Sequence, residues 1–173
     1  NDRMTAIVGA RGVGKTTLIL QHIKLHHSLK DTLYVSADDF YFSEHKLLEF
    51  AEDFHKLGGK HLFVDEIHKY NGWSKEMKLI YDYLPNLQVT FTGSSILDIF
   101  RGTDDLSRRV LLYKMYGMSF REYLNMHYQL SLPTYTLEQV LNHEVVAEGI
   151  EFPLAAFKEY LKNGYYPFAG QGN

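Results

Sequence analysis

The chain has 173 residues, a length that suits one domain, or one domain and part of a second. Of these residues 45% are hydrophobic and 23% are charged, which are ordinary values for a globular protein and exclude a disordered chain. Its formal net charge of −3 gives no general attraction for nucleic acids, and no apolar run approaches the ~20 residues of a membrane-spanning helix. Cysteine is absent, which excludes disulfide frameworks and zinc–thiolate sites, and we expect a cytoplasmic protein.

Apolar segments of strand length alternate with longer segments of helical periodicity, a pattern typical of parallel strands joined by crossover helices. We expect strands at residues 4–8, 32–36, 60–65, 87–92 and 109–115, and helices at residues 15–27, 44–57 and 74–84. After Gly117 the pattern is helical, at residues 119–126, 137–146 and 153–162. The sequence therefore predicts an α/β sandwich with a parallel sheet over residues 1–118, followed by a small helical subdomain over residues 119–173.

A glycine-rich stretch joins the first expected strand to the first expected helix. It reads Gly9-Ala10-Arg11-Gly12-Val13-Gly14-Lys15-Thr16, and Thr17 follows it. Glycines let successive N–H groups turn toward one anion, and the helix N-terminus adds its dipole. We expect these nine residues to bind a nucleotide, with Lys15 at the β- and γ-phosphates, Thr16 as a Mg²⁺ ligand and Thr17 near the α-phosphate. A chance glycine turn before a helix is the alternative.

Two carboxylates, Asp65 and Glu66, mark the end of the third expected strand. A parallel sheet places the ends of its strands at one edge, so Asp65 is expected to reach the Mg²⁺ held by Thr16. Glu66 would then orient or deprotonate an attacking water. A strand that ends in a solvated acidic turn is the alternative. His68 completes an Asp-Glu-x-His box typical of superfamily-2 helicases, but those have two motor domains, and we expect no role for His68.

Polar residues also follow the fourth expected strand. A hydroxyl at this place can hydrogen-bond the γ-phosphate or the attacking water, and Ser94 is the first candidate for this sensor, ahead of Ser95. The alternative for these serines is a helix N-cap. Arg108 and Arg109 lie at the start of the fifth expected strand. Either could neutralise transition-state charge, in this subunit or in a neighbouring one, and surface ion pairs are the alternative.

Two other features are expected to be structural. His22 and His26 are spaced to share a helix face beside His27, but no third metal ligand is evident, so we expect an exposed face. Trp73 and the Tyr- and Phe-rich residues near the C-terminal end are expected to pack in the core and the helical subdomain rather than to stack on bases.

Five segments together resemble the prokaryotic AAA-type ATPases that are often paired with a C-terminal DUF4143 region. They are Gly-Ala-Arg-Gly-Val-Gly-Lys-Thr-Thr at 9–17, Phe-Val-Asp-Glu-Ile-His-Lys-Tyr-Asn-Gly-Trp at 63–73, Phe-Thr-Gly-Ser-Ser at 91–95, Leu-Ser-Arg-Arg-Val at 106–110 and Met-Ser-Phe-Arg-Glu-Tyr-Leu at 118–124. The resemblance covers residues 3–124. It implies a three-layer α/β/α P-loop NTPase fold of the ASCE type, with an extra strand between the glycine-loop strand and the acidic strand, and a helical lid.

The same resemblance implies ATP rather than GTP as the nucleotide, and a longer protein whose C-terminal domain is absent from this chain. It also favours Arg109 over Arg108 as the arginine finger. Our leading hypothesis is Mg²⁺-dependent ATP hydrolysis that drives or switches the attached domain, with Glu66, Lys15, Ser94 and Arg109 as catalytic residues. The alternatives are a nucleotide-gated signalling switch that binds ATP or ADP with negligible turnover, and a DNA-associated motor. A homo-oligomer is compatible with each of them.

Overall fold

The computed structural model describes residues 3–94, 106, 108–145, 149 and 152–167. The chain divides into two compact units, which we name the sheet unit (Asn1–Tyr116) and the helical unit (Gly117–Asn173). The division falls between residues 116 and 117, whereas the sequence predicts a boundary between residues 118 and 119.

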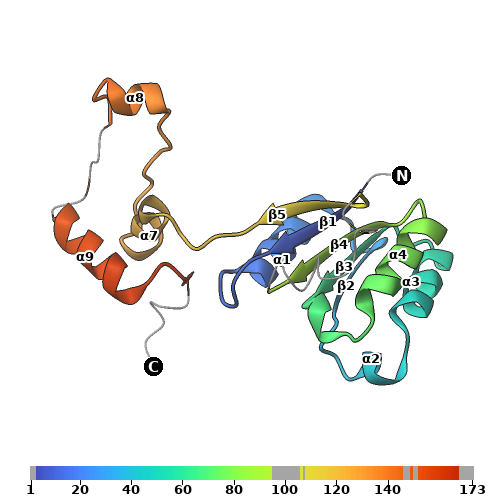
Figure 1. Ribbon diagram of the computed structural model, residues 1–173. Helices are drawn as coiled ribbons and strands as arrows, with labels where there is room; N and C mark the ends of the chain where they lie inside the picture. Colours follow the sequence, from blue (N-terminus) through green and yellow to red (C-terminus); the bar gives the residue numbers. More distant parts are fainter. Residues whose placement is uncertain (1–2, 95–105, 107, 146–148, 150–151, 168–173) are drawn as a thin grey trace. The chain divides into compact units, whose positions relative to one another are not determined.

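The sheet unit is built on a five-stranded sheet (Figure 1). Its strands are β1 (Met4–Val8), β2 (Thr32–Ser36), β3 (His61–Asp65), β4 (Gln88–Gly93) and β5 (Val110–Lys114), in the order β2-β3-β4-β1-β5. The pairings between neighbours are parallel, which confirms the predicted parallel sheet. β4 lies between the glycine-loop strand β1 and the acidic strand β3, as the resemblance implies.

Helices cover both faces of this sheet, which confirms the three-layer α/β/α fold. They are α1 (Lys15–His26), α2 (Tyr41–Glu44), α3 (Leu47–Lys56), the 3₁₀ helix η1 (Ile67–Lys69) and α4 (Trp73–Tyr83). Alternate residues of each strand point to opposite faces. Val8 and Val64 belong to the large core cluster with residues of α3 and α4. Phe63 instead packs with Ile19 and Ile23 of α1.

Two segments differ from the helices that the sequence predicts. The helix expected over residues 44–57 begins only at Leu47, because His45 and Lys46 have extended backbones that separate it from α2. The helix expected over residues 137–146 is the short α8 (Leu137–Leu141), and it is followed by His143 with a left-handed φ of 57°. Neither α2 nor η1 was expected, since three or four residues are too few to display a helical period.

The helical unit contains α7 (Phe120–His127), α8 and α9 (Pro153–Asn163). Tyr123 and Leu124 of α7 pack against Ala156 of α9 to form its buried cluster. The Tyr160 hydroxyl donates a hydrogen bond of 2.8 Å to the Met118 carbonyl. These tyrosines therefore pack within the unit, as expected. In the described part of the chain, every helix is too short or too polar to cross a membrane.

Candidate functional site: a phosphate loop beside an acidic strand end

The glycine loop lies between β1 and α1, and its glycines are needed by the backbone. Gly12 and Gly14 have φ angles of 80° and 104°, in the left-handed region that side chains with a Cβ rarely adopt. A Cβ at Gly9 would collide with the Met115 carbonyl oxygen. The loop leads directly into the first turn of α1. It can therefore keep this shape only with glycine at these positions.

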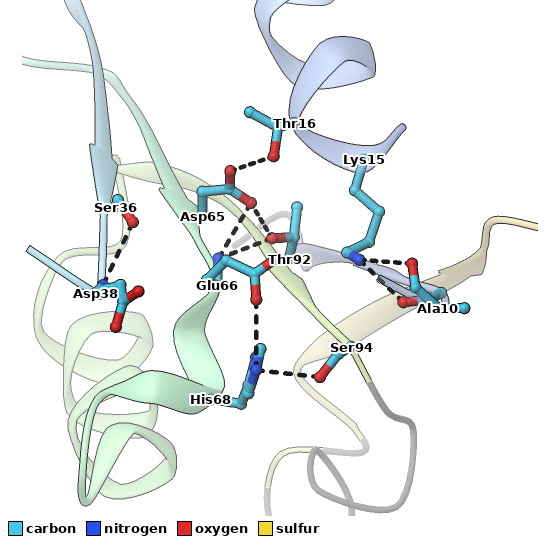
Figure 2. A network of polar contacts seen from close by, with 11 residues as sticks. Ala10, Lys15, Thr16, Ser36, Asp38, Asp65, Glu66, His68, Thr92 and Ser94 are labelled. Carbon is cyan, nitrogen blue, oxygen red and sulfur yellow. Dashed lines mark hydrogen bonds and ion pairs between the residues drawn. The ribbon is translucent and has the colours of Figure 1, made fainter. Parts of the chain in front are cut away.

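Lys15 is the first residue of α1, and the residue is only 4% exposed. Its ammonium donates hydrogen bonds of 2.9 Å to the Gly9 carbonyl and 3.1 Å to the Ala10 carbonyl (Figure 2). Within the described residues it forms no ion pair with a carboxylate. A buried cation that is held by neutral carbonyls alone favours an anion beside it. The loop therefore combines shape and charge that suit a phosphate group.

Asp65 is the buried end of β3, and its carboxylate accepts four hydrogen bonds. Oδ2 accepts them from the Thr16 hydroxyl at 2.6 Å and from the Tyr34 hydroxyl at 2.9 Å. Oδ1 accepts them from the Thr92 hydroxyl and from the Glu66 N–H at 3.1 Å. Burial opposes the charged carboxylate, but these hydrogen bonds outweigh burial and lower the pKa of Asp65. The carboxylate is thus ionised at neutral pH.

The strands explain why these side chains meet. In the parallel register, Tyr34 is opposite Phe63, and Ser36 is opposite Asp65. Phe63 packs against α1, so Tyr34 and Asp65, which share its face, also lie on the α1 side. Burial, followed by the hydrogen bond to Asp65, raises the pKa of Tyr34, which keeps its hydroxyl a donor.

The contact between Thr16 and Asp65 fits a magnesium site. Hydroxyl and carboxylate oxygens are the hard ligands that Mg²⁺ accepts, and the ion commonly takes its remaining ligands from water and nucleotide phosphates. No cluster of three or more His, Cys, Asp or Glu side chains that could hold a metal by itself occurs in the described part of the chain. Thr16 and Asp65 would therefore hold Mg²⁺ only together with a bound nucleotide.

Glu66 and Ser94 are linked by a residue for which we expected no role. The Glu66 N–H donates to the Thr92 hydroxyl oxygen at 2.9 Å, and Glu66 Oε2 is 3.4 Å from His68 Nε2. The same nitrogen is 3.1 Å from Ser94 Oγ (Figure 2). His68, for which no role was expected, therefore lies in contact with two of the predicted site residues. Ser95, the second sensor candidate, lies outside the described residues.

Arg109 does not approach the loop of its own chain. It immediately precedes β5, and its carbonyl accepts a hydrogen bond from the Met4 N–H at the start of β1. Its guanidinium forms hydrogen bonds of 3.0 and 3.3 Å to the Asp82 carboxylate. The glycine loop follows the opposite end of β1. In this structure the guanidinium thus lies away from the loop of its own chain, and the role of Arg109 as an arginine finger stays a prediction.

Three contributors were not predicted as parts of the site: Tyr34, Thr92 and His68. Tyr34 and Thr92 lie on strands that flank β3, and only the register shows that they face Asp65. The signal that could have identified them is the alternation along each strand, which places every second residue on the face of α1. The Asp-Glu-x-His box does mark His68. That box is typical of superfamily-2 helicases, which have two motor domains, so it suggests no role for this residue in a single domain.

The chain matches the family described as AAA domain over residues 1–124. The uncharacterized protein MJ1637 of Methanocaldococcus jannaschii is 31% identical over 191 residues, which cover 98% of this chain and 39% of the relative. The solved FIGL-1 AAA domain in complex with ADP has a TM-score of 0.53 at 12% identity, covering 81% of this chain and 53% of that one. A solved structure described as the structural basis for katanin self-assembly has a TM-score of 0.56 at 18% identity, covering 91% of this chain and 52% of that one.

The chain thus spans less than half of the curated relative and about half of each solved chain. At these low identities, the two solved structures establish the fold alone. The family match covers the glycine loop, the acidic strand end and the whole sheet unit. The chain therefore belongs to the AAA domain family, and its sheet unit has the α/β/α fold of a P-loop NTPase.

Proposed function

We propose that this chain binds ATP with Mg²⁺ at the glycine loop and hydrolyses it to ADP and phosphate. The observation that carries this proposal is the 2.6 Å hydrogen bond between Thr16 and Asp65, next to the buried ammonium of Lys15. It joins the phosphate loop to the acidic end of β3, and Glu66 is the next residue. Phosphoryl transfer depends mainly on positioning and on electrostatic stabilisation, which these groups can supply.

The roles follow from the chemistry of each side chain. The loop N–H groups and Lys15 would bind the β- and γ-phosphates. Thr16 and Asp65 would hold Mg²⁺, which neutralises charge on the phosphate oxygens when it is bound. Glu66 would accept a proton from the attacking water as the water oxygen bonds to the γ-phosphorus. The bond between the γ-phosphorus and the bridging oxygen breaks, and the bridging oxygen leaves with ADP. Ser94 would donate a hydrogen bond to the γ-phosphate. Adenine is favoured by the resemblance and by the ADP complex of the FIGL-1 domain.

The hydrolysis is proposed to drive or switch a domain outside this chain. The partial coverage of the curated relative supports this view, as does the resemblance to ATPases paired with a DUF4143 region. Self-assembly of the kind described for katanin would allow Arg109 to act on the site of a neighbouring copy. For that it would have to leave Asp82.

The test compares wild type with three variants, each made as the full-length protein. Wild type, Glu66→Gln, Lys15→Ala and the control Glu44→Gln, an exposed glutamate, are assayed for phosphate release from ATP with Mg²⁺ and with EDTA. We expect Glu66→Gln to lose activity at least about 100-fold while it still binds ATP, because it lacks the base. Lys15→Ala should lose nucleotide affinity, and Glu44→Gln should match wild type.

Two results would reject parts of this proposal. If wild type releases no phosphate at any protein concentration, hydrolysis is wrong and the nucleotide-gated switch replaces it. If Lys15→Ala binds ATP as tightly as wild type in calorimetry, the loop is not the nucleotide site.

A further inference from the structure

His68 joins two residues of the proposed site through a single ring nitrogen. Its Nε2 is 3.1 Å from Ser94 Oγ and 3.4 Å from Glu66 Oε2. The side chain is only 18% exposed, and that of Glu66 is 30% exposed. Figure 2 shows the ring between these two side chains, below the contacts of Asp65. Whether Ser94 or His68 donates the hydrogen between them depends on the state of the ring.

Two observations determine that state. The other nitrogen, Nδ1, is buried and has no hydrogen-bond partner among the residues that the structure describes. A hydrogen on Nδ1 would therefore be a buried donor without an acceptor, which is more costly than a bare lone pair. In addition, a carboxylate oxygen faces Nε2, and it attracts an N–H but repels a lone pair. Both observations favour the tautomer with its hydrogen on Nε2.

The state of the ring fixes the direction of the neighbouring hydrogen bonds. With its hydrogen on Nε2, His68 donates to Ser94 Oγ, and the Ser94 hydroxyl hydrogen is left free to donate elsewhere. This single N–H is shared with the Glu66 carboxylate, which lies slightly farther away, at 3.4 Å, and has only acceptor oxygens. Ser94 is thereby prepared to donate to a phosphate oxygen, and Glu66 to accept from a water.

We propose that His68 is a positioning residue that sets Ser94 as a donor to the γ-phosphate and holds Glu66 as the acceptor for water. This inference rests on the proposed ATP hydrolysis and deepens it. It predicts that discrimination between ATP and ADP depends on a residue that itself touches neither nucleotide. It also predicts that Ser94 and His68 act as one unit.

The first test uses variants of the full-length protein. His68→Phe keeps a planar ring without the nitrogen, and we expect kcat to fall at least about tenfold with KM nearly unchanged, because positioning is lost. His68→Gln places an amide N–H near the position of Nε2, and it should recover most of that loss. His68→Phe combined with Ser94→Ala should cost little more than either change alone, since coupled residues are not additive. Additive effects, or equal loss with Gln and Phe, would overturn the proposal.

The second test does not require turnover. In the Glu66→Gln background, calorimetry with ATP and with ADP gives the ratio of the two affinities. We expect His68→Phe to weaken ATP binding severalfold and to leave ADP binding unchanged. Nitrogen-15 NMR of histidine-labelled protein should find His68 with its hydrogen on Nε2, identified by the signals lost in His68→Gln. A hydrogen on Nδ1, or an unchanged affinity ratio, would reject the inference even if hydrolysis is confirmed. If hydrolysis is absent, both measurements still decide the inference.

Discussion

At the scale of single residues, Asp65 is unusual because protein donors occupy both of its carboxylate oxygens. Thr16, Tyr34, Thr92 and the Glu66 N–H donate hydrogen bonds to these oxygens. They stabilise a buried charge and fix the orientation of the carboxylate. Thr16 and Asp65 were predictable from motif and topology. The donors on β2 and β4 depend on the register between strands, which the sequence does not specify.

The hydroxyl of Tyr34 can be removed without changing the ring. Because Tyr34→Phe deletes one hydrogen bond to a charged group, we expect it to lower the free energy of unfolding by about 1–3 kcal/mol. Urea unfolding without nucleotide measures this change. Tyr41→Phe is a matched control, because Tyr41 is exposed and stacks on His45 through its ring. If both variants unfold at the same urea concentration, the bond from Tyr34 does not stabilise the fold.

At the scale of elements, the length of each helix or strand decided whether the sequence could predict it. The strands of five or six residues were found within one residue of their bounds, because alternation or a continuous apolar run marks them. The short helices α2 and η1 were missed, since their residues complete barely one turn. Arg109 shows a different limit of prediction from motifs. It was grouped with the site by motif, yet a residue just before a parallel strand lies at the amino edge of the sheet, away from a loop at the carboxyl edge.

The capping box of α7 permits a prediction for one element. The Ser119 hydroxyl accepts from the Glu122 N–H at 3.3 Å, and the Glu122 carboxylate accepts from the Ser119 N–H at 2.7 Å. These contacts with Ser119 also lower the pKa of Glu122. Ser119→Ala should cost ~1 kcal/mol, which corresponds to about fivefold faster amide exchange in the first turn of α7. Thr136→Ala, in the similar box of α8, is the control.

Hydrogen exchange followed by mass spectrometry resolves the two helices. Each variant should accelerate exchange in its own helix only. Faster amide exchange in α8 of the Ser119→Ala variant would mean that the helical unit loosens as a whole. The effect of the cap would then not be confined to α7.

At the scale of the whole molecule, a cluster of imidazoles makes stability depend on pH. His27 follows α1, and its ring lies 5.0 Å from that of His22 and 4.4 Å from that of His61 at the start of β3. Burial lowers the pKa of His27 from 6.5, and repulsion from His61, His22 and His26 lowers it further, while Asp31 raises it. The expected exposed face of α1 is therefore part of a cluster that includes a histidine from β3.

The sign of the pH effect follows from this lowered pKa. Between the pKa of folded His27 and 6.5, its value in the unfolded chain, the unfolded chain binds more protons, so acid favours unfolding. The stabilising contribution is complete above the unfolded pKa, and it is lost as the pH falls toward the folded value. Urea unfolding at about pH 7.5 and about pH 5.5 should find the chain less stable at the lower pH, and His27→Gln should reduce the difference. Exposed His45→Gln is the control. If His27→Gln leaves the pH dependence as steep as in wild type, other groups are responsible for it.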